Sequence, residues 1–222
     1  DFNLQGWGKA LKRTSLHDLH ISMGGKIVPF AGWEMPLQFQ GILSETRSVR
    51  SSVGIFDISH MGRVDIIGAE SSHLLQTILT SDVSDLDVGR AKYSLICNDL
   101  GGIIDDAIVY RTTLDSYRLV PNASNTKDVL NWLINWRTFL KIDAQINSIT
   151  DETSMIAIQG PKSIDSLQPI CNVELSSFGK FRIVESEVAG VKSYISSTGY
   201  TGEIGFELML PSKNAGDIWS KL

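Results

Sequence analysis

Gly101-Gly102-Ile103-Ile104-Asp105-Asp106-Ala107-Ile108-Val109-Tyr110 is an apolar, strand-forming stretch that carries two adjacent carboxylates. It follows Asn98-Asp99, and polar residues with a glycine pair are typical of a turn. Residues 92–98 on one side and 117–120 on the other also have strand character, and Leu114-Asp115 separates the last two segments. The sequence therefore predicts an antiparallel meander of three strands.

The two carboxylates of this stretch are expected to have different roles. A buried carboxylate is costly unless it is hydrogen-bonded, neutralised or used by a ligand. Successive side chains of a strand point to opposite faces, so Asp105 and Asp106 do not both line one site unless a bulge intervenes. We expect one to serve structure and the other chemistry, and the apolar residues on both faces leave open which is which. The arrangement also argues against glycoside hydrolysis, which needs two carboxyls facing one substrate.

The rest of the chain alternates strand-like and helix-like segments without a regular strand-helix-strand repeat. This predicts an α+β fold of antiparallel sheets with flanking helices. The periodicity of apolar residues predicts helices over 41–53, 74–79, 125–140 and 215–222, and strands over 63–67, 154–159, 181–188, 191–196 and 206–210.

Composition excludes several classes of protein. The 222 residues are 42% hydrophobic and carry a formal net charge of −5. A basic stripe for nucleic acid is lacking, so we expect no nucleic-acid partner. No apolar segment approaches the roughly 18 residues of a membrane span, and residues 1–10 lack the apolar core of a signal peptide. We therefore expect an intracellular or matrix protein that does not enter a membrane.

Residues 198–207, Thr-Gly-Tyr-Thr-Gly-Glu-Ile-Gly-Phe-Glu, form a second notable segment. The glycine spacing differs from the dinucleotide fingerprint and no helix follows, so we expect no NAD. In the strand that ends the segment, Phe206 and Leu208 share the core face and Glu207 is opposite. Glu207 can therefore reach a cavity, although a solvated surface glutamate is the simpler alternative. His17 and His20 have no further ligands to complete a metal site, so we expect no metal.

Taken together, the segments resemble the T-protein of the glycine cleavage system, a folate-dependent aminomethyltransferase. The resemblance covers nearly the whole chain, and several motifs in order make it specific. The matching motifs are residues 11–14, 28–36 (Val-Pro-Phe-Ala-Gly-Trp-Glu-Met-Pro), 56–61 (Phe-Asp-Ile-Ser-His-Met), 101–110, 159–161 (Gln-Gly-Pro) and 198–207.

The resemblance implies a fold of three lobes around a folate pocket. It implies a Greek-key-like first domain from residues 1–60 and 147–183, and an inserted α+β second domain from 61–146 and 184–222. The third, β-barrel lobe is expected to be absent, as is an Ala-Arg-Asp-Ser segment that should lie just beyond Leu222. We therefore interpret the sequence as the N-terminal two-thirds of such an enzyme.

The resemblance also implies a reaction and a set of site residues. An aminomethyl group on the lipoyl arm of the H-protein is transferred to tetrahydrofolate, giving methylenetetrahydrofolate and ammonia. Asp105 is implied as the catalytic carboxylate, with Asp106 as its structural neighbour. The residues implied in the folate pocket are Tyr93, Asn122, Tyr200 and Glu207, with Asp106 and Glu203 as further candidates. Such residues suit a pterin, because tyrosines stack on a flat ring while a carboxylate accepts from its donor-rich edge.

An alternative function is a folate-binding module without transfer activity, because related folds serve in iron-sulfur assembly and in demethylating flavoenzymes. The Asp105 motif and the Gly32-Trp33 turn favour the transferase. The resemblance leaves the organism open, so the expected location is the bacterial cytoplasm or the mitochondrial matrix.

Overall fold

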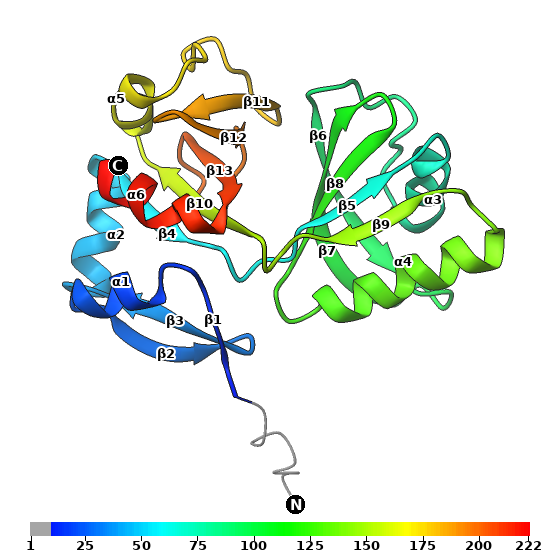
Figure 1. Cartoon of the computed structure of the whole chain (residues 1–222), viewed down its shortest axis with the longest axis horizontal. Helices are drawn as coiled ribbons and strands as arrows, with labels where there is room; N and C mark the ends of the chain where they lie inside the picture. Colours follow the sequence, from blue (N-terminus) through cyan, green and yellow to red (C-terminus); the bar gives the residue numbers. More distant parts are fainter. Residues whose placement is uncertain (1–9) are drawn as a thin grey trace, which may run out of the picture.

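The computed structural model describes residues 10–222 and consists mainly of two five-stranded sheets (Figure 1). The expectation that residues 1–10 are not a signal peptide falls almost wholly on residues 1–9, which lie outside the described residues. The sheets occupy the two halves of the view in Figure 1, and apart from one short parallel pair the strands run antiparallel. The α+β architecture predicted from the sequence is therefore confirmed.

The first sheet has the strand order β11-β12-β13-β10-β4 and brings together segments far apart in the sequence. Leu208 and Ile156 lie opposite each other in the β10–β13 pair and belong to its apolar core. Helices α5 and α6 contribute Leu167 and Ile218 to the same core. The elements are β4 (Gly54–Asp57), β10 (Thr153–Gln159), α5 (Ser163–Leu167), β11 (Ile183–Val188), β12 (Val191–Ser196), β13 (Gly205–Pro211) and α6 (Ala215–Lys221).

The second sheet has the order β6-β7-β8-β5-β9 and contains the meander predicted around residues 101–110. Helices α3 and α4 supply Leu74 and Leu133 to a core that also holds Val109 of β7. The elements are β5 (Val64–Ile67), α3 (Ser71–Ile78), β6 (Ala91–Cys97), β7 (Ile103–Thr113), β8 (Ser116–Pro121), α4 (Thr126–Leu140) and β9 (Gln145–Ser148).

A small three-stranded sheet, order β1-β3-β2, precedes the two large ones. Ala31 and Gly32 both have positive φ, which closes the tight turn between β2 and β3. Trp33 and Met35 are buried beside this turn, whereas Phe30 is exposed. The elements of this part are β1 (Lys12–Arg13), α1 (His17–Ser22), β2 (Lys26–Phe30), β3 (Trp33–Gln38) and α2 (Ile42–Ser51).

The two large sheets pack directly against each other. Tyr110 and Val120 of the second sheet form one apolar cluster with Met155 and Met209 of the first. Backbone bonds reinforce the contact, since the amide of Ile183 donates to the carbonyl of Gly89 over 2.9 Å. This interface fixes the loops and strand faces that form the site.

The pairing of the strands corrects the expected division into domains. Residues 184–222 were assigned to the second domain, but β12 and β13 pair with each other and β13 pairs with β10. They therefore belong to the first sheet, together with β4. Short adjacent strands carry too little local information to show which partner they pair with, so this assignment could not be made from the pattern of apolar residues.

Candidate functional site

A cavity of about 690 Å³ lies where the two sheets meet. We call it the Glu207 cavity. Its walls come from β6 and β7 of the second sheet, from β13, and from the loops around residues 175–181 and 197–205. Four charged side chains are among its lining residues: Asp106, Lys180, Glu203 and Glu207. Three of these four are carboxylates, so the cavity is suited to a ligand that presents hydrogen-bond donors.

The strand β7 divides its two carboxylates between two environments, as expected from strand geometry. Asp106 and Ile108 line the Glu207 cavity. Asp105 lies on the other face, which also carries Val109 into the core beneath α4, and only 2% of its surface is exposed. Asp106 therefore reaches this cavity and Asp105 does not, whereas the resemblance implied Asp105 as the catalytic carboxylate.

Asp105 is held by three hydrogen bonds. The backbone amide of Asn122 donates to Oδ2 over 2.8 Å, and Nδ2 of Asn122 donates to Oδ1 over 2.9 Å. Nδ2 of Asn125 donates to Oδ1 over 2.7 Å. Asn125 is the N-cap of α4, but its side chain makes no capping bond and serves Asp105 instead. These bonds offset the cost of burying the carboxylate, which is the structural role that the sequence left open between the two aspartates.

Asn122 links the two carboxylates. Its Nδ2 lies 2.9 Å from Oδ1 of Asp105 and 3.1 Å from Oδ1 of Asp106. The resemblance implied Asn122 in the folate pocket, but Asn122 is not among the residues that line the Glu207 cavity, and its side chain contacts Asp106, which does line it. The structure thus assigns it a position from which it can orient Asp106.

Glu207 reaches the cavity from β13, as its position opposite Phe206 and Leu208 predicted. Its surface is only 2% exposed, so the simpler alternative of a solvated glutamate is wrong. Burial raises the pKa of its carboxyl above the ordinary value, opposed by hydrogen bonds from Thr198 and Tyr110 to Oε2. The other oxygen, Oε1, is buried and has no hydrogen-bond partner within residues 10–222. A buried acceptor of this kind is costly, so Oε1 is available to a donor from a molecule that enters the cavity.

The remaining candidates lie at the same cavity with different surroundings. Tyr93 and Tyr200 both line it and are both exposed, so their ring faces are accessible to a planar ligand. Glu203 also lines it, but its carboxylate accepts from Nη1 of Arg50 over 2.9 Å. Because that ion pair already neutralises Glu203, Glu203 is a weaker candidate than Asp106 or Glu207.

Two residues of the site were missed by the sequence reasoning. Tyr110 ends the stretch of residues 101–110, where it reads as an apolar strand residue, yet its hydroxyl lies 2.8 Å from Oγ1 of Thr198. Thr198 begins the glycine-rich segment, where its hydroxyl gave no signal of its own. Their role depends on the packing of two sheets, which a local pattern does not report.

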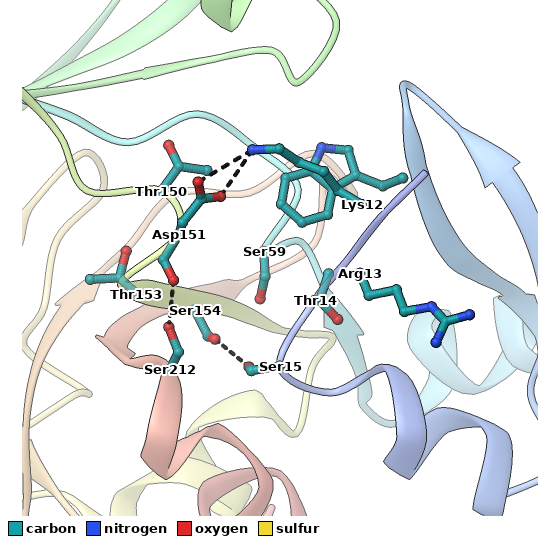
Figure 2. Close-up of a pocket in the computed structure, with 11 residues that line it drawn as sticks. Lys12, Arg13, Thr14, Ser15, Ser59, Thr150, Asp151, Thr153, Ser154 and Ser212 are labelled. Atoms are coloured by element: carbon teal, nitrogen blue, oxygen red, sulfur yellow. Dashed lines mark hydrogen bonds and ion pairs between the residues drawn. The ribbon is translucent and has the colours of Figure 1, made fainter. Parts of the chain in front are cut away.

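A second cavity, of about 440 Å³, lies beside β1 (Figure 2). Its polar groups already have partners within the protein. Lys12 is paired with Asp151 at 3.1 Å, and the hydroxyls of Ser15 and Ser154 bond each other at 2.6 Å, as Figure 2 shows. It therefore lacks the unpartnered buried acceptor that distinguishes the Glu207 cavity.

Two further features of the described residues bear on the sequence expectations. His20 is fully buried and its Nε2 lies 3.0 Å from Oδ2 of Asp57, so it is committed to a partner on β4. Within residues 10–222 no group of three or more His, Cys, Asp or Glu side chains is placed to hold a metal ion. In the same range no helix is long and apolar enough to cross a membrane.

Comparison with known proteins gives consistent matches over this region. Residues 16–222 match the family model described as the GCVT N-terminal domain. The aminomethyltransferase of Thermotoga maritima is 43% identical over 96% of this chain and 58% of its own length. The chain therefore spans somewhat more than half the length of the curated relatives it matches.

Solved structures show the same fold. The glycine cleavage system aminomethyltransferase T of Bartonella henselae matches with a TM-score of 0.87 and 31% identity, over 95% of this chain and 56% of that one. A heterotetrameric sarcosine oxidase from Corynebacterium matches with a TM-score of 0.64 at 12% identity, over 95% of this chain and 92% of that one. The second likeness shows the fold alone.

Proposed function

We propose that this chain, which belongs to the GCVT N-terminal domain family, carries the tetrahydrofolate site of an aminomethyltransferase. The observation that carries the proposal is the unpartnered, buried Oε1 of Glu207 in a cavity that also presents Asp106. The pterin ring of a folate has a donor-rich edge and two flat faces. Glu207 suits the edge, and the exposed rings of Tyr93 and Tyr200 suit the faces.

The proposed reaction transfers an aminomethyl group from the lipoyl arm of the H-protein to tetrahydrofolate. The carbon forms bonds to two folate nitrogens, its bonds to the lipoyl sulfur and to the amino nitrogen break, and ammonia and the dihydrolipoyl arm are released. The two nitrogens lose one proton each as the new bonds form, and these protons end on the departing amino nitrogen and on the sulfur of the dihydrolipoyl arm. Tetrahydrofolate therefore acts as a co-substrate, and the lipoylated H-protein is the partner.

Within this proposal, Asp106 takes the role that the family resemblance gave to Asp105. Asp106 lines the cavity and is within hydrogen-bond distance of Asn122, so it can be oriented toward a reacting nitrogen and assist the movement of its proton. Asp105 acts as a positioning residue, because its carboxylate holds both the amide and the side chain of Asn122.

The test is tetrahydrofolate-dependent release of ammonia from aminomethylated H-protein, measured on protein of the length of the curated relatives. We expect Asp106→Asn to lower the rate by about 100-fold or more, in the range of general acid–base contributions. The matched control is Glu185→Gln, an exposed carboxylate of similar chemistry that pairs with Lys192 across β11–β12, outside the cavity. Wild-type turnover in Asp106→Asn would contradict the assignment of Asp106. Folate binding without any ammonia release in the wild type would favour the non-catalytic folate-binding module.

A further inference from the structure

Three hydroxyl groups form a network that ends on Oε2 of Glu207, the carboxylate oxygen opposite the unpartnered Oε1. Oγ1 of Thr198 donates to Oε2 of Glu207. The hydroxyl of Tyr110 lies 2.8 Å from Oγ1 of Thr198 and 3.4 Å from Oε2 of Glu207. Oγ of Ser196 lies 2.9 Å from Oγ1 of Thr198. All four residues are nine-tenths or more buried.

The count of hydrogens fixes the direction of this network. A threonine hydroxyl has one hydrogen and two lone pairs. When Glu207 is ionised, its carboxylate can only accept. Thr198 therefore donates its one hydrogen to Oε2, and the lone pairs of Thr198 can accept from other groups. The single hydrogen of Tyr110 therefore points to Oγ1 of Thr198, 2.8 Å away, and reaches Oε2 of Glu207 only as a longer, shared contact of 3.4 Å. The carboxylate is held by a chain from Tyr110 through Thr198.

The chain crosses the interface between the two sheets. Tyr110 lies on β7 of the second sheet. Thr198 comes just after β12 of the first sheet, and Glu207 lies on β13 of the same sheet. Tyr110 also packs in the apolar cluster that joins the sheets, with Met155 and Met209. The orientation of Glu207 is thus tied to the way the two sheets sit against each other.

We propose that Tyr110 is a positioning residue that orients Glu207 across the interface between the sheets, leaving Oε1 free for the pterin edge. The identity of the ligand rests on the proposed function, but the orientation of Glu207 does not. Through this contact, any change in the packing of the two sheets alters the carboxylate that recognises the folate.

Burial supports the same direction of donation. Burial first, and then the charge of Glu207, raises the pKa of Tyr110 well above its ordinary value. Tyr110 therefore keeps its proton near neutral pH and is able to donate. The other ionisable groups that line the cavity are Asp106, Lys180, Glu203, Tyr93 and Tyr200, and a substitution of Tyr110 leaves all of them in place.

The experiment compares Tyr110→Phe with Tyr117→Phe, each of which removes one hydroxyl from a buried tyrosine of the second sheet. Tyr117 is the matched control, because its hydroxyl is buried without a hydrogen-bond partner within residues 10–222. The first readout is the pKa of the Glu207 carboxyl in the ligand-free protein, from carbon-13 NMR titration with the signal assigned by Glu207→Gln. Loss of a donor disfavours the charged form, so Tyr110→Phe should raise this pKa and Tyr117→Phe should not.

The second readout is the dissociation constant for tetrahydrofolate. We expect Tyr110→Phe to weaken binding by roughly 5- to 10-fold, since one link that orients the acceptor is lost, with no change in Tyr117→Phe. An unchanged pKa of Glu207 in Tyr110→Phe would overturn the inference, even if that variant were less stable, because it would leave Tyr110 a purely structural role. Absence of folate binding in the wild type would instead overturn the proposed function, and the pKa readout would still decide the role of Tyr110.

Discussion

Asp105 and Asp106 are adjacent in β7, yet their carboxylates lie on opposite faces of the sheet, one buried under three hydrogen bonds and the other in the Glu207 cavity. Asn122 contacts both, with Nδ2 2.9 Å from Oδ1 of Asp105 and 3.1 Å from Oδ1 of Asp106. The pair thus consists of a buried, hydrogen-bonded carboxylate and a carboxylate that lines the cavity, joined by one amide. A strand is well suited to this arrangement, because adjacent residues are forced into different environments.

Asp105→Ala should destabilise the protein far more than Asp106→Ala. Removal of the Asp105 carboxylate leaves donors of Asn122 and Asn125 without their partner, at a cost of roughly 2–4 kcal/mol. Asp106→Ala should change the free energy of unfolding by less than about 1 kcal/mol. Urea denaturation of both variants measures the difference. Equal stability of the two variants would show that the buried network does not support the fold.

The outcome for this pair illustrates what the sequence could and could not predict. The alternation of side chains along 101–110 correctly separated the two environments, since that rule is local to one strand. Which face meets the cavity depends on where α4 packs, and that contact joins residues 105 and 125 across a hairpin. The family resemblance named Asp105, and only the packing of α4 over it shows that Asp106 is the aspartate that lines the Glu207 cavity.

The same contrast holds for Glu207 and its neighbours. Its position opposite Phe206 and Leu208 could be read from the strand pattern, and the structure confirms it. Its contacts with Tyr110 could not be predicted, because the two residues lie in different sheets and 97 positions apart. The assignment of 184–222 to the wrong domain has the same cause.

Glu207 should make stability depend on pH in a way that Glu207→Gln removes. Burial raises the pKa of Glu207 above its ordinary value of 4.5, so between these two values the folded state binds more protons than the unfolded state. Stability from this group is therefore lost as pH rises through that window. The free energy of unfolding of Glu207→Gln, minus that of the wild type, should increase from pH 4.5 upward and then level off. A difference that stays constant with pH would show that the carboxyl is not perturbed by burial.

Tyr200 should contribute to folate affinity through its ring and not through its hydroxyl. Tyr200→Ala removes a stacking face at the cavity and should weaken tetrahydrofolate binding by roughly 0.5–1.5 kcal/mol, beyond the area lost. Tyr200→Phe keeps the face and should bind within about twofold of the wild type. Calorimetric titration of the two variants separates the contributions. Equal losses in both would mean that the hydroxyl, and not the ring, contacts the ligand.

The central claim is that tetrahydrofolate binds in the Glu207 cavity and not in the polar cavity beside β1. The most direct test is an NMR titration of the isotopically labelled protein with tetrahydrofolate, which detects weak as well as tight binding. We predict saturable shifts of the backbone amides of Tyr93, Asp106 and residues 198–207, with little change at Lys12 and Asp151. Saturable shifts centred on Lys12 and Asp151, or no saturable shift at residues 198–207, would contradict the account.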